Sequence, residues 1–296
     1  MKALYFEKYG NSDVLSLRDL PKPEPGPDRV LVKVQAASVN PLDWRLMRAD
    51  PFLVRMAFGF FKPKVHGLGA DFSGVVEATG DGVSAFEPGA AVFGIMTPET
   101  VGSFAEYVSI PEDALVRKPD ALSHAQAGTL GIAALTAYQG IHDYRRPGPG
   151  DRVLINGASG GIGTFAVQMG KALGAHVTGV CSGHNHERVR ALGAEAVIDY
   201  RSVDLLQIEE RFDLVFDAVG NHRPKAMKRL LREKGRLVLA SAASGWGFFK
   251  AMAISRKARE PVDLIIHLRK DRERLQSVVA LCEAGKVTPV IDREYS

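Results

Sequence analysis

A run of small residues in the middle of the chain, Gly157 to Gly163 (GASGGIG), has the residue types of a loop that holds a phosphate. Glycines let the backbone turn sharply and approach a pyrophosphate without a Cβ in the way. The strict G-x-G-x-x-G pattern is met only in part, because Ala158 holds the first glycine place. A glycine turn without a ligand is the alternative. The residues predicted to surround the phosphates are Ser159, Gly160, Gly161, Ile162 and Gly163.

The elements that must position this turn are a strand and a helix. Val153–Asn156 is a short apolar, β-prone run, as in a buried strand. After the turn, apolar residues recur every three or four positions from Phe165 to Leu173, which predicts a helix. The N-terminus of such a helix offers unpaired N–H groups and a positive dipole end to phosphate oxygens.

Further strands follow with the spacing of a parallel sheet. The predicted strands are His176–Cys181, Ala196–Asp199, Leu214–Phe216 and Gly235–Ala240. Ligands of open parallel sheets lie beyond the carboxyl ends of the strands. Ser182, Val219 and Ser241 stand at such ends and are predicted to contact the cofactor.

The end of the second strand bears on the choice of cofactor. NAD-specific enzymes place an acid about 20 residues past the glycines, where it binds the ribose 2′-hydroxyl. Here the strand ends Val180-Cys181-Ser182-Gly183, without an acid. A carboxylate would repel a 2′-phosphate, whereas a small Cys-Ser pair leaves room for one. NADPH is therefore predicted over NADH. Arg188, which follows closely, is equally typical of a solvated helix start.

Composition sets the broad class. The chain has 296 residues, 46% hydrophobic and 24% charged, and a net charge of +4 that is spread along the chain apart from a rise at Lys250–Arg274. That size allows two domains, and the mild basicity is weak evidence for nucleic acid. Two distant cysteines give no disulfide framework and favour a reducing cytoplasm. No run reaches the roughly 18 apolar residues of a membrane span. We therefore expect a cytoplasmic protein with a small-molecule partner, no nucleic acid and no membrane contact.

The first 120 residues have a different pattern from the rest of the chain. Short β-like runs are broken by Gly and Pro, which predicts an irregular β domain. The predicted strands are Leu4–Phe6, Val30–Ala36, Gly74–Ala78 and Ala91–Phe93.

Four motifs in this region occur in one order: SVNPLDW (Ser38–Trp44), GADFSGVVEATGDGV (Gly69–Val83), FEPGAAVFG (Phe86–Gly94) and GSFAEYVSIP (Gly102–Pro111). Together with the glycine turn, the chain resembles the medium-chain dehydrogenase/reductase superfamily. It is most similar to the zinc-free quinone oxidoreductase (zeta-crystallin-like) branch. The resemblance implies an α/β fold: a Rossmann-type doubly wound parallel sheet plus an irregular, GroES-like catalytic β domain. The expected parts are a catalytic domain at 1–122, a nucleotide-binding domain at 123–265 and a return segment at 266–296.

The resemblance also shows which residues to inspect for a zinc site. At the places of the zinc ligands of zinc-dependent relatives, this chain has Asn40, Ala70 and Ile132, none of which is a competent ligand. His66 lies out of register, and the four clustered cysteines of a structural zinc lobe are absent. No metal is expected. In zinc-free relatives the residues corresponding to Asn40 and Asp43 line the substrate cleft, so both are predicted to be catalytic by orienting a carbonyl. Asn40 before Pro41 and Asp43 after it are equally typical of an ordinary turn, in which both would have only a structural role.

Three further cofactor contacts are implied by the resemblance. The segment Ser123–Tyr144 is predicted to be a buried helix capped by Ser123, and Gly128 and Gly131 suggest close approach of another backbone or ligand. In relatives its LTAY segment faces the cofactor, which implicates Thr136, although a helix–helix contact fits as well. Relatives place the tyrosine of VIDY, here Tyr200, against the adenosine. Asn185 stands where the branch often has a lysine.

The C-terminal region is predicted to hold a helical stretch and an entry strand near Val262–Leu268, then a helix at Leu275–Ala284 that stops at Gly285. Relatives continue for roughly 25–30 residues as a helix and a strand, so either this chain is a fragment or part of the first domain's sheet is expected to be missing.

These observations favour a zinc-independent, NADPH-dependent oxidoreductase that reduces a quinone, an enone or a related carbonyl compound, with a homodimer as a possible assembly. The alternatives are an NADPH-binding scaffold or sensor with little catalysis and, more weakly, a zinc alcohol dehydrogenase. The loop Asp50–Lys64 carries Phe52, Met56, Phe58, Phe60 and Phe61, which fit a substrate wall, a dimer contact or plain core.

Overall fold

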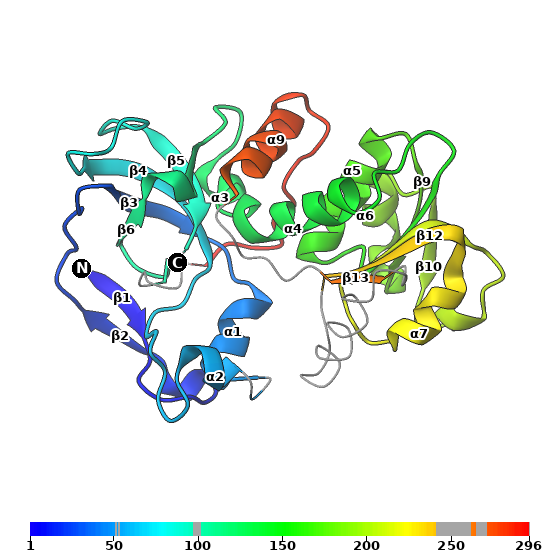
Figure 1. Ribbon diagram of the computed structural model, residues 1–296, viewed down its shortest axis with the longest axis horizontal. Coiled ribbons are helices and arrows are strands. Elements are labelled where there is room, and N and C mark those ends of the chain that lie inside the picture. The colour runs from blue at the N-terminus through cyan, green and yellow to red at the C-terminus, as the bar shows by residue number, and fades with distance from the viewer. Residues whose placement is uncertain (51, 53, 97–101, 241–261, 265–270, 296) are drawn as a thin grey trace. The chain divides into compact units, whose positions relative to one another are not determined.

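The computed structural model describes residues 1–50, 52, 54–96, 102–240, 262–264 and 271–295, and all structural statements refer to these residues (Figure 1). The chain forms two compact units. Unit 1 comprises residues 1–132, 268–283 and 291–296, and unit 2 comprises residues 133–267 and 284–290. The sequence placed the boundaries after residues 122 and 265, whereas the structure divides the chain after residues 132, 267, 283 and 290.

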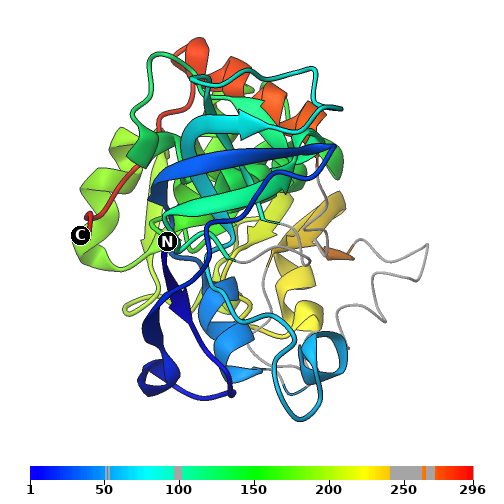
Figure 2. The same cartoon turned by 90° about the vertical axis from the view of Figure 1, so that its left-hand side faces the viewer.

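Unit 1 is built on two antiparallel sheets, seen from its side in Figure 2. A two-stranded sheet pairs β1 (Lys2–Tyr5) with β2 (Ser16–Asp19). A five-stranded sheet has the order β6-β3-β4-β5-β7. Its strands are β3 (Arg29–Ala37), β4 (Asp71–Thr79), β5 (Ala91–Ile95), β6 (Tyr107–Pro111) and β7 (Leu115–Arg117). Alternate apolar residues from these strands form the core, among them Val32, Phe72 and Ile110. The four predicted strands are confirmed, with bounds shifted by a few residues.

The helices of unit 1 are short, apart from the last. They are α1 (Pro41–Arg48), α2 (Val54–Phe58), α3 (His124–Ala127), a π-helical turn at Leu130–Ala134 and α9 (Arg272–Glu283), with 3-10 turns at Ser12–Val14 and Glu112–Ala114. Helix α1 is anchored by Met47, which belongs to a small apolar cluster with Phe6 and Leu68. Helix α9 packs against β7, so it joins unit 1 although it follows unit 2 in sequence.

Unit 2 contains a six-stranded parallel sheet in the order β10-β9-β8-β11-β12-β13. The strands are β8 (Arg152–Asn156), β9 (His176–Cys181), β10 (Ala196–Asp199), β11 (Phe212–Asp217), β12 (Leu231–Leu239) and β13 (Val262–Leu264). The helices are α4 (Leu135–Tyr138), α5 (Gly161–Ala172), α6 (His186–Ala191) and α7 (Pro224–Met227), with a π-helical turn at Gln139–Asp143 and 3-10 turns at Gly183–Asn185, Leu205–Gln207 and Lys228–Leu230.

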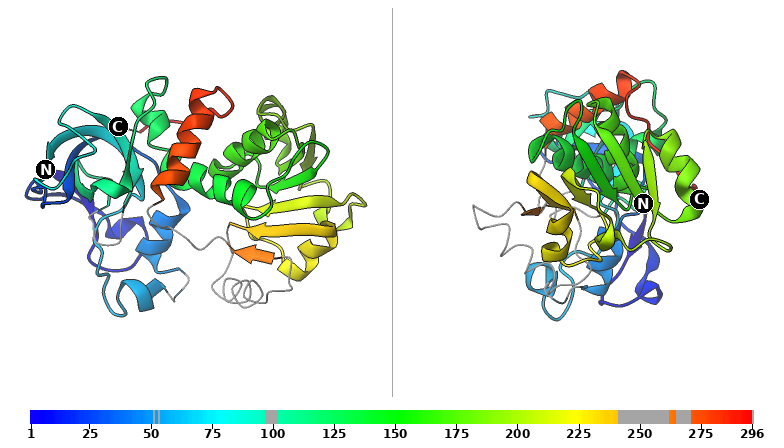
Figure 3. Two further views of the ribbon diagram at one scale, coloured as in Figure 1. Left: turned by 45° about the horizontal axis from the view of Figure 1, so that its top comes forward. Right: turned by 90° about the vertical axis from the view of Figure 1, so that its right-hand side faces the viewer.

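The strand order of unit 2 reverses between β8 and β11. The chain steps outward from β8 to β9 and β10, then returns to β11 on the other side of β8 and steps outward again. Because crossovers between parallel strands are right-handed, this reversal puts helices on both faces of the sheet (Figure 3). The carboxyl ends of β8 and β11 are therefore the switch point where open sheets of this kind bind ligands.

The side chain of Gln168 bonds the segment 284–290 to helix α5 of the same unit. Gln168 on α5 donates from Nε2 to the carbonyl of Thr288 at 3.0 Å and accepts from the N–H of Thr288 at 2.8 Å. Both polar ends of the amide are thus bonded to the backbone of one residue, which lies 120 positions further along the chain.

Most predicted elements of unit 2 are present. Strands β9 and β10 match their predicted ranges, and β8 and β11 contain theirs. The predicted strand Gly235–Ala240 is the second half of β12. The described part of the predicted entry strand is β13, and the rest lies outside the described residues. The predicted last helix begins earlier, at Arg272, and Gly285 follows it with a φ of 66°.

The predicted helix over Ser123–Tyr144 is present, but it is interrupted by a turn after Ala127 and is not a regular α-helix. Ser123 is the expected N-cap, and its Oγ accepts from the N–H of Gln126 at 3.1 Å. The segment then alternates between α and π turns. A Cβ on Gly131 would lie 2.5 Å from Cβ of Asp71, and one on Gly140 would lie 2.2 Å from the ring of Phe216. The glycines therefore serve close packing against β4 and β11, as Gly131 had suggested. Among the described helices, none is both long and apolar enough to cross a membrane.

Candidate functional site

The glycine turn of unit 2 joins β8 to α5. The N–H groups of Gly157 and Ala158 both donate to the carbonyl of Val180, at 3.1 and 3.0 Å, which fixes the turn to β9. Gly157 has a φ of 87°, and a Cβ on Gly163 would lie 2.0 Å from the Gly157 oxygen. A Cβ on Gly160 would meet only that oxygen, at 3.4 Å. Gly157 and Gly163 are thus required by the turn itself, whereas Gly160 borders open space at the start of α5.

Three of the predicted cofactor residues lie together beside this turn. The Nδ2 of Asn185 lies 3.3 Å from Oγ of Ser159 and 3.2 Å from Oγ of Ser182. His184 adds its Nε2, 3.4 Å from the Ser182 hydroxyl. Asn185 therefore links the glycine turn after β8 to the carboxyl end of β9. We call Ser159, Ser182, His184 and Asn185 the serine cluster.

An acid that the sequence reasoning missed reaches the same place from the neighbouring strand. Asp199 ends β10, and its Oδ2 lies 2.7 Å from where a Cβ on Gly183 would be. Its Oδ1 accepts from the N–H of Arg201 at 2.9 Å. The fingerprint places the acid on the strand after the glycine turn, so it gives no signal for an acid one strand further along. Tyr200 is exposed, and its N–H donates to the Cys181 carbonyl at 3.3 Å.

The switch point holds a second group of buried polar side chains. Asn156, at the end of β8, donates from Nδ2 to Oδ1 of Asp217 at 2.8 Å, at the end of β11. The same oxygen accepts from the N–H groups of Val219 and Gly220, at 3.0 and 2.9 Å. Asp217 is fully buried, and its Oδ2 has no hydrogen-bond partner in the described structure. Asn156 and Asp217 were not predicted; their signal was the polar residue that ends each apolar run.

The remaining predicted cofactor residues vary in how much the structure says about them. Val219 lies against the glycine turn, because its Cγ2 is 2.7 Å from where a Cβ on Gly157 would be. Thr136 is half-buried on α4, which packs against α5. Gly161 and Ile162 open helix α5. Ser241 lies outside the described residues. The role of each as a cofactor contact stays a prediction.

In unit 1, polar groups converge on the carboxylate of Asp71 at the start of β4. Ser38 donates to its Oδ1 at 2.6 Å, and Asn40 donates to the same oxygen from Nδ2 at 3.0 Å. The N–H of Ile132, in the π-helical turn, donates to Oδ2 at 2.9 Å. Asp71 is fully buried, and this burial raises the pKa of its carboxyl to about 7 despite those donors. Asp71 and Ser38 were not predicted, because nothing local in the sequence shows contacts that span tens of residues.

Asp43 has a different set of partners. Its Oδ2 accepts from the N–H of Asn40 at 2.6 Å, and its Oδ1 accepts from the N–H of Gly69 at 3.0 Å. The first bond closes the N-terminal turn of α1, and the second ties α1 to the segment before β4. Burial raises the pKa of Asp43, and the two backbone donors oppose the rise. This is the turn chemistry that the sequence offered as an alternative to catalysis.

Two of the residues aligned with zinc ligands, Asn40 and Ile132, thus donate to Asp71 instead. His66, out of register by sequence, stacks on Tyr5 and bonds the Phe6 carbonyl through Nδ1 at 2.9 Å. Within the part of the chain that the structure describes, no group of three His, Cys, Asp or Glu side chains is arranged to hold a metal ion.

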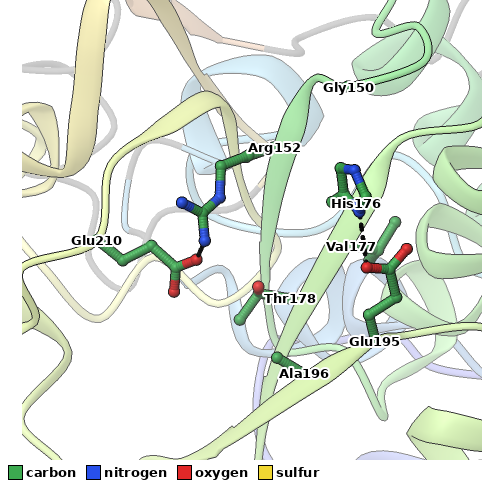
Figure 4. A pocket seen from close by; sticks show the side chains of 8 residues that line it. All are labelled: Gly150, Arg152, His176, Val177, Thr178, Glu195, Ala196 and Glu210. Carbon is green, nitrogen blue, oxygen red and sulfur yellow. Dashed lines mark hydrogen bonds and ion pairs between the residues drawn. The ribbon is translucent and has the colours of Figure 1, made fainter.

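A separate polar pocket of about 400 Å³ lies at the amino ends of β8, β9 and β10 (Figure 4). Arg152 pairs with Glu210 there, and His176 pairs with Glu195 at 2.7 Å. Its charged groups therefore already have partners. It lies at the opposite end of the strands from the glycine turn, so we do not assign it to the cofactor.

Comparisons with known proteins agree with this architecture. Residues 26–120 match the alcohol dehydrogenase GroES-like domain, and residues 192–296 match the zinc-binding dehydrogenase family. The human protein "NAD(P)H oxidoreductase RTN4IP1, mitochondrial" is 34% identical over 335 residues, covering 100% of this chain and 83% of that protein. A chloroplastic quinone-oxidoreductase homolog from Spinacia oleracea is 30% identical over 313 residues, covering 100% of this chain and 91% of its own length.

Among solved structures, the quinone oxidoreductase from Coxiella burnetii superposes with a TM-score of 0.85 at 32% identity, covering 97% of this chain and 88% of that one. A parallel doubly wound sheet with a glycine turn, joined to a GroES-like β unit, defines a two-domain dehydrogenase or reductase. The chain belongs to the medium-chain dehydrogenase/reductase superfamily, in its quinone oxidoreductase branch.

Proposed function

We propose that the chain is a zinc-independent oxidoreductase that uses NADPH to reduce a quinone, an enone or a related carbonyl compound. The observation that carries the proposal is the glycine turn, where open space at Gly160 meets the N-terminus of α5. A nicotinamide cofactor supplies the hydride when bound, so the protein has to bind, orient and polarise. Relatives named NAD(P)H oxidoreductase and quinone oxidoreductase support this class of reaction.

The residues of unit 2 fit such a cofactor. The start of α5 offers N–H groups to the pyrophosphate. At the switch point, Asp217 holds the N–H groups of Val219 and Gly220 through its Oδ1 and so fixes the turn that we propose to face the ribose. The serine cluster presents hydroxyl and amide groups, and β9 ends without an acid, which favours a 2′-phosphate. Asp199 opposes that preference in part, and one of its oxygens accepts a hydrogen bond from the Arg201 N–H.

In unit 1 we propose different roles for the two predicted catalytic residues. Asn40 has an amide that is bonded to Ser38 and Asp71 and is thereby held in one orientation. Because both amide hydrogens already have acceptors, we propose that Asn40 orients a substrate carbonyl by exchanging one of these bonds for the substrate oxygen. Asp43 has both oxygens bonded to backbone N–H groups, so we propose that it positions Asn40 instead of contacting the substrate.

The test is NADPH oxidation measured with a panel of quinones and enones, with NADH as the parallel cofactor and bound metal determined in the same preparation. We expect turnover with NADPH and at least one quinone or enone, without stoichiometric zinc. Asn40→Ala should lower kcat more than it changes KM, and Asp43→Asn should also lower the melting temperature.

A second candidate, an NADPH-binding protein with little catalysis, is favoured by one observation: every carboxylate oxygen of Asp43 and Asp71 already has a donor within unit 1. Tight NADPH binding by fluorescence without oxidation by any compound of the panel would select this candidate. A cytoplasmic location also stays a proposal, since the relatives compared above carry mitochondrial and chloroplastic in their names.

A further inference from the structure

The region of helices α1 and α2 exposes large apolar side chains to solvent. The exposed fractions are 36% for Trp44, 61% for Phe52, 72% for Met56, 52% for Phe60 and 87% for Phe61. We call these five side chains the aromatic patch. The sequence left three explanations for the apolar loop: a substrate wall, a dimer contact or plain core. The exposure of these side chains excludes plain core. Monomeric proteins rarely expose large apolar side chains in such a group without a function.

Three rings of the aromatic patch contact one another, and hydrogen bonds hold the loop that carries them. The rings of Phe52 and Phe60 lie 5.7 Å apart edge to face, and those of Phe60 and Phe61 lie 5.0 Å apart in the same way. Tyr9 donates its hydroxyl to the carbonyl of Gly59 at 2.8 Å, which ties the loop to the start of the chain. The N–H of Lys64 donates to the carbonyl of Phe58 at 2.7 Å and closes the loop. The exposure is therefore a property of a braced loop.

Basic residues surround the aromatic patch. Residues 45–64 contain five basic residues, Arg45, Arg48, Arg55, Lys62 and Lys64, and one acidic residue, Asp50. Their net charge of +4 equals that of the whole chain.

Several of these cations lie directly among the rings. The guanidinium carbons of Arg45 and Arg48 lie 5.3 and 5.5 Å from the ring of Trp44. That of Arg55 lies 5.4 Å from the ring of Phe52. Lys62 and Lys64 are exposed beside Phe61. Glu7, whose pKa is lowered chiefly by Arg18 and slightly by Lys62, is paired with Arg18 at 2.8 Å.

We propose that the aromatic patch and its basic residues dock unit 1 onto the surface of an anionic lipid bilayer. Aromatic rings and a methionine can enter the boundary between headgroups and acyl chains, while lysine and arginine bind anionic headgroups. This is contact with one face of a membrane, and no helix has to cross it. It departs from the sequence-based expectation of no membrane contact, because exposure could not be read from the sequence.

The positive charge argues against a second copy of the chain and against a neutral substrate as the occupant of this surface. A two-fold dimer through the patch would bring two surfaces of charge +4 together, and like charges destabilise such a contact. A neutral quinone or enone has no need of five cations. A single-stranded nucleic acid would use the cations and the rings, but it gains little from Met56, which has no face for base stacking.

The experiment is co-sedimentation of the full chain with vesicles of phosphatidylcholine alone and with vesicles that also contain phosphatidylglycerol. We expect binding to the anionic vesicles that weakens at high salt. One basic residue near the surface strengthens binding by about fivefold, so Lys62→Glu with Lys64→Glu should weaken it by at least about twentyfold. Phe60→Ser with Phe61→Ser should weaken it by a similar factor.

Matched controls come from unit 1 outside the patch. Leu17→Ser removes an apolar side chain that is 65% exposed on β2, and Lys33→Glu reverses an exposed charge on β3. Both should bind anionic vesicles as the unchanged chain does. All variants should keep its melting temperature, which separates a docking defect from misfolding.

Five outcomes would overturn the proposal: no binding to anionic vesicles; equal binding to neutral vesicles; a shift from dimer to monomer in the Phe60/Phe61 variant without lipid; tighter binding of a single-stranded oligonucleotide than of anionic vesicles; or equal weakening by the controls. Because sedimentation needs no substrate or cofactor, it is independent of the outcome for the proposed enzymatic function.

Discussion

The polar groups around Asp71 in unit 1 and the serine cluster with Asp217 in unit 2 differ in how completely their hydrogen bonds are satisfied. Both oxygens of Asp71 and both of Asp43 accept from donors inside unit 1. In unit 2, Asp217 keeps a buried oxygen without a partner, and Gly160 borders open space. A closed network fixes the positions of its members, whereas open donors and acceptors wait for a ligand. The carboxylates of unit 1 thus have all their oxygens bonded internally, whereas unit 2 keeps one oxygen without a partner and open space at its glycine turn.

The largest expected effect tests the closed network. The pKa of Asp71 is about 7 in the folded chain and near 4 in the unfolded chain, so the folded state holds the proton more tightly. The free energy of unfolding should therefore fall as pH rises from about 4 to about 7, by up to about 4 kcal/mol, and then stay level. Asp71→Asn should lose most of this fall and keep the smaller part that comes from Asp43, whose pKa is also raised by burial. Urea unfolding at pH 5 and pH 8 measures it.

The control for this measurement is Asp81→Asn, in an exposed turn of unit 1. It should keep the pH dependence of the unchanged chain. If Asp71→Asn keeps it as well, Asp71 is already ionised in the folded chain at pH 5, and the donors from Ser38, Asn40 and Ile132 outweigh the effect of its burial.

The next effect tests the open end of unit 2. Gly160→Val should weaken NADPH binding by at least a hundredfold while leaving the melting temperature nearly unchanged, because its Cβ would meet only the Gly157 carbonyl oxygen, at a van der Waals distance of 3.4 Å. Gly163→Val is the contrasting variant: its Cβ would lie 2.0 Å from the Gly157 oxygen, so binding and stability should fall together. Titration by nucleotide fluorescence and thermal unfolding separate the two. Unchanged NADPH affinity in Gly160→Val would mean that the glycine turn does not bind the pyrophosphate.

A smaller effect concerns the serine cluster. Ser182→Asp places a carboxylate at the end of β9, which should repel a 2′-phosphate and accept from a 2′-hydroxyl. We expect the ratio of kcat/KM for NADPH over NADH to fall by about tenfold or more, equivalent to about 1.4 kcal/mol. Thr178→Ser, on the same strand but away from its carboxyl end, should leave the ratio unchanged. A ratio that does not move for Ser182→Asp would put the 2′ site elsewhere.

The smallest effect concerns the acid contributed by β10. Asp199→Asn keeps the bond from the Arg201 N–H and removes the charge beside Gly183. The preference for NADPH should rise by about three- to fivefold, as expected for one partly exposed charge near a phosphate. Asp204→Asn, which caps a 3-10 turn further on, is the control. A preference that rises equally in both variants would mean that only overall charge matters.

Sequence patterns predicted the elements of unit 2 well and the networks of side chains poorly. Strands such as β9 are apolar runs between clear turn residues, so their ends are encoded locally. The helix over Ser123–Tyr144 is interrupted after Ala127 and then alternates α and π turns, and its Gly131 and Gly140 pack closely against distant strands, which gives no local signal. Asp71 and Asp199 were missed for the same reason. The donors to Asp71 lie up to 61 residues away along the chain, and Asp199 lies beside Gly183 of the neighbouring strand end, and one sequence carries no record of that proximity.

The clamp of Gln168 on Thr288 has a consequence for the order in which the protein is made. Contacts between residues far apart in sequence close late, because the chain between them must first be ordered. Helix α5 cannot gain these two bonds until 120 further residues have been synthesised. The helix that follows the glycine turn therefore gains its last hydrogen bonds only after Thr288 has been synthesised. A nascent chain halted before Thr288 is expected to hold NADPH more weakly than one halted after it.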